Sequence, residues 1–314
     1  MTTVEQAELG ATTALTAERR RRWRPSTGSN WWRHLIGILA CLFALFPLIY
    51  VVSAAFNAIP TLVGVSASPV PKHVTLDNFR NVLKTEQFDP TVATPHFVWW
   101  YINSLIIPGT AAIFSVFMGA LAAYAFSRFR FKGRRMGMLA LLLIQMFPAF
   151  LSLVAIYLIL SNVGDVFQFA GLNTRVGLIL VYLGGAMGVN TWLMKGFFDT
   201  IPSELDESAR VDGATPAQIF WGVILPLATP VLAVIALISF ITALNEFVIA
   251  SAVLQTPEKY TLIVGLQQFV SDNYAKAWGP FAAGVVLTAI APTLLFFALQ
   301  RFIVEGLTGG AVKG

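Results

Sequence analysis

The sequence predicts an all-α membrane protein with six transmembrane helices and an additional helix in the loop between the fourth and fifth spans. Three observations predict this fold: the composition, six long apolar stretches, and the distribution of basic residues. Of 314 residues, 56% are hydrophobic and only 12% are charged, and the mean hydropathy is +0.71. Soluble domains usually carry about 25% charged residues. Lipid must therefore solvate much of the surface.

A spanning helix needs about 20 mostly apolar residues to cross about 30 Å of hydrocarbon. Six stretches meet this requirement, at 35–57, 103–126, 136–160, 176–194, 227–254 and 277–300. Only the fifth contains a charged residue, Glu246. The first stretch is longer than the core of a secretory signal, about 7–15 residues, and five more spans follow it, so we interpret it as a retained helix.

Basic residues are concentrated in one alternating set of loops. This set is Arg19, Arg20, Arg21, Arg22, Arg24 and Arg33 before the first span, Arg128, Arg130, Lys132, Arg134 and Arg135 after the second, Lys195 and Arg210 after the fourth, and Arg301 and Lys313 after the sixth. The opposite set holds only Lys72, Arg80, Lys84, Arg175, Lys259 and Lys276. The positive-inside rule therefore predicts a multi-pass membrane protein with both termini in the cytoplasm. The basic runs orient the chain in the lipid bilayer, and nucleic acid is not expected as a partner.

The remaining segments define three regions. Residues 1–30 are expected to form a disordered basic cytoplasmic arm, 31–304 the transmembrane domain, and 305–314 a cytoplasmic tail. In the long external stretch, apolar residues at helical spacing over 75–83 predict a short surface helix with Leu76, Phe79, Val82 and Leu83 on one face.

Catalytic and metal chemistry have no support in the sequence. Cys41 is the only cysteine, and the three histidines are scattered, so no metal site is expected. No GxxxxGK[ST] phosphate loop is present. The chain is therefore not expected to be an enzyme or to hold a cofactor of its own.

The loop between the fourth and fifth spans, 195–226, is too long and too patterned for a simple turn. Ser203 is expected to cap a helix with acidic residues in its first turn, which suits the helix dipole. Gly213 is expected to end that helix. Thr215 and Pro216 are expected to start a second helix, as cap and first residue.

This loop resembles the coupling signature of binding-protein-dependent ABC importer permeases. The family pattern is Glu-Ala-Ala, three residues, Gly, nine residues, then Ile-x-Leu-Pro. Here it reads Glu207-Ser208-Ala209, Gly213, and Val223-Ile224-Leu225-Pro226 at the same spacing. Ser208 and Val223 depart from the pattern by small changes. Further stretches, including 145–148, 171–174, 182–185 and 306–314, resemble the smaller permease of maltose/maltodextrin importers.

The resemblance implies roles for three segments. The first is a cytoplasmic coupling helix that docks in a cleft of the ATPase, with Glu207, Ser208, Ala209, Asp212 and Gly213. The second is a tail that contacts the ATPase, with Gly310, Val312 and Lys313. The third is an external loop that contacts the binding protein, with Gln255, Thr256, Pro257 and Glu258.

The resemblance also implies a location in the bacterial inner (plasma) membrane. The partners that it implies are a homologous second permease, two ATPase subunits that use ATP and Mg²⁺, and an extracytoplasmic sugar-binding protein. The function it implies is inward movement of a sugar by alternating access. Maltose, maltodextrins and trehalose are all compatible with the sequence.

Polar residues inside the spans are a separate prediction. Ionisable groups at membrane depth are costly and often functional, so Asn245 and Glu246 are expected to line or gate the translocation path, together with Gln145 and Asn103. Asn190 is a further candidate for a wet interior. Alternatively, Glu246 simply lies near the outer interface, or neighbouring helices hold it in its protonated form.

Two other classes of function fit the sequence less well. A secondary transporter driven by an ion gradient would favour several buried acids or an inverted repeat, whereas one buried Glu and no visible repeat are found. A membrane-embedded enzyme would need clustered His, Asp or Ser residues at one depth, and no such cluster is found in the sequence.

Overall fold

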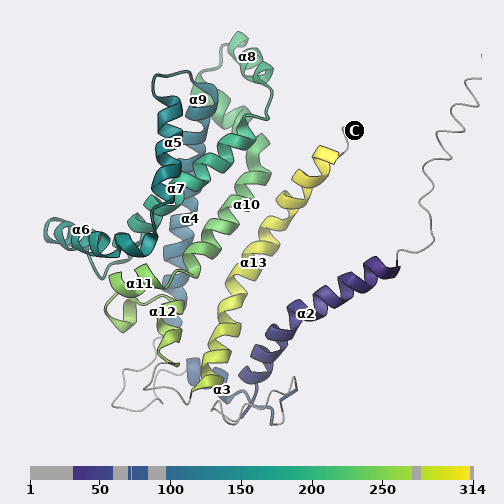
Figure 1. The fold of residues 1–314 in the computed structure, drawn as a ribbon, viewed down its shortest axis with the longest axis vertical. Helices are drawn as coiled ribbons and strands as arrows, with labels where there is room; N and C mark the ends of the chain where they lie inside the picture. Colours follow the sequence, from purple (N-terminus) through teal and green to yellow (C-terminus); the bar gives the residue numbers. More distant parts are fainter. Residues whose placement is uncertain (1–30, 59–69, 72, 84–96, 271–276, 312–314) are drawn as a thin grey trace, which may run out of the picture. The chain divides into compact units, whose positions relative to one another are not determined.

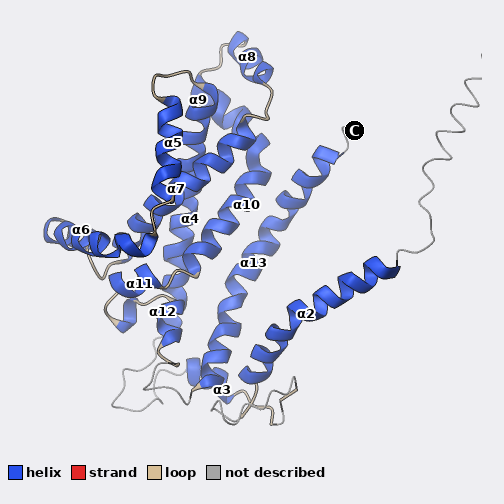
Figure 2. Cartoon of the chain, in the orientation of Figure 1, coloured by secondary structure: helices blue, strands red, loops and turns tan. Residues whose placement is uncertain are grey.

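The computed structural model describes residues 31–58, 70–71, 73–83, 97–270 and 277–311. The predicted arm at 1–30 lies outside the described residues. The chain divides into two units, Met1–Tyr50 and Val51–Gly314, and each is described by itself. The described residues are helical apart from loops and a single isolated bridge between Asn57 and Val74, which confirms the all-α fold class (Figure 2).

Helix α2 (Trp31–Ala55) begins in the first unit. Its side chains from Trp31 to Ile49 are all exposed although most of them are apolar. Lipid is the solvent that suits such a surface. The helix corresponds to the first predicted span.

The second unit is built on four long helices, α4 (Phe97–Arg128), α7 (Arg175–Phe198), α10 (Leu225–Leu244) and α13 (Trp278–Ala311). Helix α4 packs against α7 and α10, and α10 packs against α13 (Figure 1). Small residues make the close packing of α4 possible, as is usual between helices in membranes. A Cβ added to Gly119 would lie only 3.2 Å from the Cβ of Asn190 on α7.

Five described helices are long and apolar enough to span a membrane, or six if one sharply bent pair counts as a single span. That pair is α5 (Arg134–Gln145) and α6 (Leu153–Val166), which meet at 85° across η1 (Ala149–Ser152). The predicted span at 136–160 therefore corresponds to two helices that meet at a sharp bend. Pro148 explains the break, because proline disfavours a helical conformation at the preceding residue and offers no N–H.

The fifth predicted span, 227–254, is also interrupted. Helix α9 (Pro216–Ile219) continues through the π-turn η3 (Phe220–Ile224) into α10. Pro226 accounts for the wide turn, because its ring would clash with the carbonyl four residues earlier in a regular helix. Helix α10 then ends at Leu244, and a short α11 (Val248–Val253) follows.

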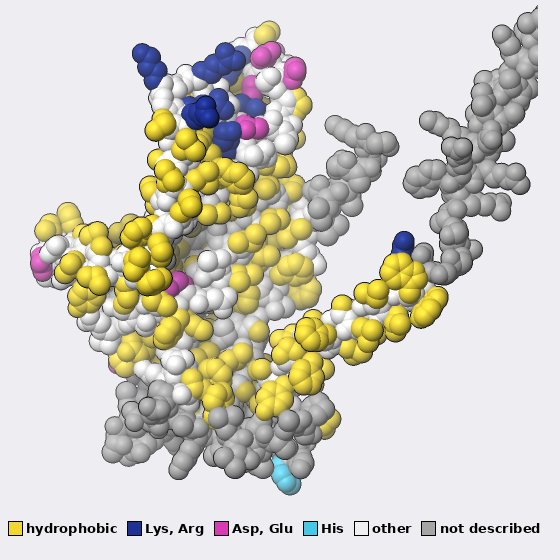
Figure 3. Space-filling view, in the orientation of Figure 1, with side chains coloured by type: hydrophobic (Ala, Val, Ile, Leu, Met, Phe, Trp, Pro, Cys, Tyr) yellow, Lys and Arg dark blue, Asp and Glu magenta, His cyan; other side chains and the backbone are white. Residues whose placement is uncertain are grey.

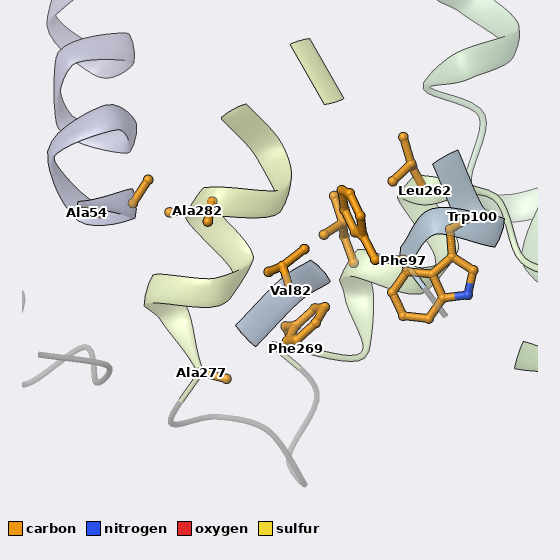
Figure 4. Packing of buried hydrophobic residues seen from close by; sticks show 11 residues of the cluster. Ala54, Val82, Phe97, Trp100, Leu262, Phe269, Ala277 and Ala282 are labelled. Atoms are coloured by element: carbon orange, nitrogen blue, oxygen red, sulfur yellow. The ribbon is translucent and has the colours of Figure 1, made fainter. Parts of the chain in front are cut away.

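The two ends of the bundle carry different elements (Figure 1). One end carries α8 (Ser203–Val211), and the other carries α3 (Asp77–Leu83), α11, η4 (Pro257–Lys259) and α12 (Leu262–Gln267). A buried cluster that includes Val82, Phe97, Trp100, Leu262 and Phe269 holds the second end together (Figure 4).

Helix α3 was expected at 75–83 and starts at Asp77. Of its expected apolar face, Val82 is buried, but Leu76 and Leu83 are about half exposed. The polar Asn78 is buried instead, where its side-chain amide donates to the carbonyls of Ala55 (3.0 Å) and Asn57 (2.7 Å).

Candidate functional site

The segment α8–Gly213–α9 folds as the sequence pattern indicated. Gly213 has φ +83°, a conformation that glycine adopts without cost. Its N–H donates to the carbonyl of Arg210 (3.0 Å), and the N–H of Ala214 donates to that of Ala209 (2.9 Å). This is the Schellman arrangement, which ends a helix and satisfies its last carbonyls.

The cap of the second helix was predicted correctly and that of the first was not. Thr215 accepts from the backbone N–H of Gln218, whose side chain accepts from the N–H of Thr215, so a complete capping box precedes Pro216. At α8 the cap position is Pro202, and Ser203 is already the first helical residue. Ser203 therefore does not cap α8.

A buried ion pair fixes α8 to the end of α4. The guanidinium Nε of Arg128 lies 2.6 Å from Oδ2 of Asp206, and the two side chains are 9% and 4% exposed. Arg128 also donates through Nη2 to the carbonyl of Ile201 (2.9 Å). The hydroxyl of Tyr124 donates to the carbonyl of Pro216 (3.1 Å). Both helices of the segment, α8 and α9, are thus attached to the last turns of α4.

The candidate docking residues lie on the free side of this segment. Glu207, Ser208, Asp212 and Gly213 are exposed, and Ala209 is half-buried against the core. Val211, next to them, is 88% exposed. The charged side chains gathered at this end are visible in Figure 3.

A second polar cluster lies beside α8. Asp199 pairs with Lys195 (2.5 Å) and accepts from the hydroxyl of Ser127 (2.7 Å). Burial raises the pKa of the Asp199 carboxyl, but the hydrogen bonds from Lys195 and Ser127 and the charges of Lys195 and Arg134 outweigh it. The pKa of Asp199 therefore lies below its ordinary value.

The loop after α11, which the sequence predicts to be external, is held by one asparagine that the sequence analysis did not single out. Asn173 has φ +56°. Its side-chain oxygen accepts from the backbone N–H groups of Gln255 (3.0 Å) and Thr256 (3.2 Å), and its N–H donates to the carbonyl of Val253 (2.8 Å). Its own carbonyl accepts from the ammonium of Lys259 (2.8 Å).

The start of α4 supports the same loop. The indole N–H of Trp100 donates to the carbonyl of Pro257 (2.6 Å). Asn103 donates to the carbonyls of Glu258 (3.1 Å) and Tyr260 (3.0 Å) and accepts from Arg175 (2.8 Å). Gln255 and Glu258 remain exposed. These hydrogen bonds hold the backbone of the loop in place, and its tip is exposed.

Two residues expected to face a wet interior do not do so. Asn103 is fully buried, and its polar atoms are occupied by the loop contacts just described. Asn190 is buried and donates to the hydroxyls of Ser115 (3.2 Å) and Ser239 (3.0 Å), which joins α4, α7 and α10. Both were misplaced because a polar residue in an apolar run can serve packing between helices as well as a path.

Glu246 lies at the break between α10 and α11 rather than inside a helix. Its two carboxylate oxygens accept from the N–H groups of Ile249 and Ala250 (both 2.9 Å), and Tyr182 donates to Oε2 (3.1 Å). The carboxylate therefore satisfies the free N–H groups at the start of α11. Asn245 is exposed, and its side-chain amide donates to the carbonyl of Ile241 (2.9 Å).

Gln145 lies at the other helix break. It donates to the carbonyl of Gly185 on α7 (2.7 Å). It lines a largely apolar groove of about 1050 Å³ that Pro148, Gly184, Gly185 and Ile249 also line. Gln145 and the start of α11 thus border the same groove.

The predicted tail is described only in part. Helix α13 runs on to Ala311, so Gly310 is helical rather than part of an extended tail. Val312 and Lys313 lie outside the described residues.

Comparison with known proteins identifies the family. The model of the family described as binding-protein-dependent transport system inner membrane component matches residues 115–309. The match covers more than half of the chain and includes α8, Gly213 and the break at Glu246. The chain belongs to this family.

Relatives extend the match to almost the whole length. The maltose/maltodextrin permease protein MalG of Escherichia coli strain K12 is 41% identical over 286 residues, which cover 90% of this chain and 95% of the relative. The galactooligosaccharides permease protein GanQ of Bacillus subtilis strain 168 is 39% identical over 281 residues, with 90% and 94% covered.

A solved structure has the same fold. A chain of a bacterial ABC transporter involved in the import of the acidic polysaccharide alginate matches with a TM-score of 0.68 at 25% identity, over 86% of this chain and 93% of that chain. The protein is therefore a multi-pass inner-membrane permease subunit of a binding-protein-dependent transporter, and it is a transport component rather than an enzyme.

Proposed function

We propose that this permease moves a carbohydrate of the maltose/maltodextrin class inward by alternating access, driven by a separate ATPase. The observation that carries the proposal is the exposed segment α8–Gly213–α9, whose signature residues face outward while Asp206 and Tyr124 hold it to the bundle. A partner protein that binds this segment would therefore transmit its movement to the transmembrane helices.

The class of substrate rests on the relatives. MalG is named for maltose and maltodextrin, GanQ is named for galactooligosaccharides, and the transporter with the matching fold is involved in the import of alginate. All of these compounds are carbohydrates. The maltose type is favoured by the 41% identity to MalG and by the motifs at 145–148 and 306–314.

The coupling mechanism follows from the contacts of α8. Closure of the ATPase would displace Glu207, Ser208 and Asp212 on the exposed side of α8. The buried pair of Arg128 and Asp206 would carry that displacement to α4, because breaking the pair would leave an uncompensated buried charge. Helix α4 packs on α7 and α10, so the displacement would reach the helices beside the groove.

The gate is proposed at the two helix breaks. Gln145 and the start of α11 border the same groove, and Asn245 and Glu246 lie where α10 ends. The ladder of backbone hydrogen bonds is already interrupted at a break, so a helix can bend there without losing further hydrogen bonds. Rotation of α11 would change the hydrogen-bond partners of the Glu246 carboxylate and would open or close the translocation path.

Partners and orientation complete the proposal. The end with α8 is assigned to the cytoplasm, and its basic residues agree with the positive-inside rule. Two ATPase subunits and a homologous second permease would assemble there and beside the bundle. An extracytoplasmic binding protein would dock on the loop Gln255–Glu258 at the other end, with the remainder of the tail, Val312 and Lys313, reaching the ATPase.

The test is transport by the complete system in proteoliposomes. The chain would be reconstituted with the permease, ATPase and binding protein encoded beside it, and uptake of labelled maltose, trehalose and galactooligosaccharide would be compared. We expect uptake of maltose or maltodextrin when the ATPase side faces the vesicle lumen, ATP is enclosed there, and the binding protein and sugar are outside. We expect none with a proton or sodium gradient alone. Gradient-driven uptake without ATP would reject the proposal in favour of a secondary transporter.

A further inference from the structure

A second groove lies between α5 and α7 at the end of the bundle that carries α8. Its volume is about 880 Å³, within the range of small-molecule sites. It is distinct from the groove beside Gln145, with which it shares no lining residue. Nothing in the transport mechanism derived above uses it.

The walls of this groove change character along its length. The part toward the middle of the helices is lined by Met136, Leu139 and Leu142 of α5 and by Trp192 and Leu193 of α7. The part at the helix ends is lined by Arg134, Arg135 and Lys195, with Asp199 as the only acid. Figure 3 shows Lys and Arg side chains gathered at this end of the bundle, next to hydrophobic side chains.

The charges of the groove do not cancel. Lys195 and Asp199 neutralise one another in an ion pair. Arg134 donates a hydrogen bond to the carbonyl of Ser127 (3.5 Å), and its charge also acts on Asp199, which Lys195 already neutralises. Arg135 is exposed at the rim of the groove. Two positive charges therefore remain at the mouth, where helices that cross a membrane meet the headgroup layer.

The groove also has room beside the backbone of α7. A Cβ added to Gly196 would have no heavy atom within 4 Å. Trp192, one helical turn earlier, is about half exposed and stands at the side of the groove. An elongated apolar group can therefore lie along α7 with its polar end near Arg134 and Arg135.

We propose that this groove binds one anionic phospholipid, with its phosphate between Arg134 and Arg135 and an acyl chain along Trp192 and Gly196. The amphipathic walls select a lipid over a free anion, because inorganic phosphate would leave the apolar half empty. They select an anionic over a zwitterionic lipid, because three cations and one acid leave a net positive charge at the mouth of the groove. Basic pockets between transmembrane helices bind anionic headgroups in this way.

Trp192 supplies a direct readout. The full-length chain would be placed in nanodiscs of phosphatidylcholine with increasing mole fractions of phosphatidylglycerol whose acyl chains are brominated, and tryptophan quenching would be recorded. Subtraction of the signal of Trp192→Phe isolates Trp192. We expect half-maximal quenching at a mole fraction on the order of tenfold lower for brominated phosphatidylglycerol than for brominated phosphatidylcholine.

Variants locate the site. Arg135→Gln should raise the half-maximal mole fraction by roughly fivefold, as expected for one cation at a membrane surface. Gly196→Leu should abolish the saturable quenching by filling the groove. Arg130→Gln is the matched control, because Arg130 is an exposed cation of the same loop that does not line the groove. Circular dichroism of each variant would verify the helical fold.

Three outcomes would overturn the proposal. Equal quenching by the two brominated lipids would mean that Trp192 meets only bulk lipid. An equal shift in Arg130→Gln and Arg135→Gln would mean diffuse attraction to the membrane surface. Relief of quenching by millimolar inorganic phosphate would mean a free-anion site instead of a lipid site.

Discussion

Asn173, just before α7, holds the loop that follows α11 through several hydrogen bonds. A non-glycine residue at positive φ costs about 1–2 kcal/mol, and asparagine bears that conformation best. Here Asn173 bonds the backbone at three positions of one segment, Val253, Gln255 and Thr256, and its carbonyl accepts from Lys259. The external loop should therefore be ordered before any binding protein arrives, which lowers the entropy cost of docking.

Two substitutions at this position separate conformation from side-chain bonding. Asn173→Gly keeps the positive φ but removes the acceptor, whereas Asn173→Ala removes the acceptor and strains the backbone. We expect faster amide hydrogen exchange at Gln255 and Thr256 in both, and a lower thermal midpoint in Asn173→Ala than in Asn173→Gly. Unchanged exchange at these two amides would contradict the assigned role.

Asp199 gives a prediction in pH. Its pKa is lowered in the folded protein, so its charged form stabilises the fold above the ordinary aspartate pKa, and that stabilisation is lost as pH falls through the lowered pKa. The difference in thermal midpoint between the native chain and Asp199→Asn should therefore be constant from pH 8 to 5 and shrink below about pH 4. A difference that grows on acidification would show that the pKa is raised instead.

Residues with local partners were predictable from the sequence, and those with distant partners were not. Gly213, Thr215 and Pro216 act within one or two turns of their own segment, and their roles were predicted correctly. Asn103 bonds residues 155 and 157 positions away, so no local pattern reveals that it supports the loop. The signal available for Asn173 was the Gly-Leu-Asn-Thr turn before α7, which indicates a left-handed position but no partner.

At the scale of elements, the junction of α4 with α8 is the most consequential contact. Removal of one member of a buried ion pair costs about 3–5 kcal/mol, whereas an exchange of the two charges can restore the pair. Arg128→Ala and Asp206→Ala should each lower the thermal midpoint of the assembled transporter and uncouple ATP hydrolysis from transport.

The charge exchange Arg128→Asp with Asp206→Arg distinguishes coupling from folding. We expect partial recovery of transport per ATP hydrolysed relative to either single reversal. The pair Arg80 and Asp77 on α3 is the matched control, because it is equally charged but about two-thirds exposed, and its loss should cost at most about 1 kcal/mol. Equal coupling in all these variants would mean that α8 acts on the membrane helices by another route.

The positions of the long helices followed from apolar length, but their breaks did not. The bend between α5 and α6 has a visible cause in Pro148, although Pro47 and Pro108 lie inside helices that continue through them. The end of α10 has neither proline nor glycine at 245–247. At the break, the Glu246 carboxylate accepts hydrogen bonds from free N–H groups of α11. This arrangement has no periodic sequence pattern from which it could be predicted.

At the scale of the whole molecule, the asymmetry of charge sets the orientation. The end with α8 is predicted to be cytoplasmic and the end with α12 external. A reporter enzyme that is active only outside the cytoplasm should be active when fused after Asp89 and silent when fused after Arg134. The reverse pattern would invert the topology and with it the assignment of docking partners to the two ends.

The central claim is that a separate ATPase drives transport through α8 and Gly213. Sugar-stimulated ATP hydrolysis by the reconstituted complex tests it most directly, with Gly213→Pro, which cannot adopt φ +83°, and Glu207→Lys, which reverses an exposed charge of α8. Arg130→Gln, on the neighbouring loop, serves as the control. We predict full stimulation in the native chain and the control, and loss of most of the stimulation in both α8 variants despite normal membrane insertion. Native levels of stimulation and uptake in both variants would contradict the account.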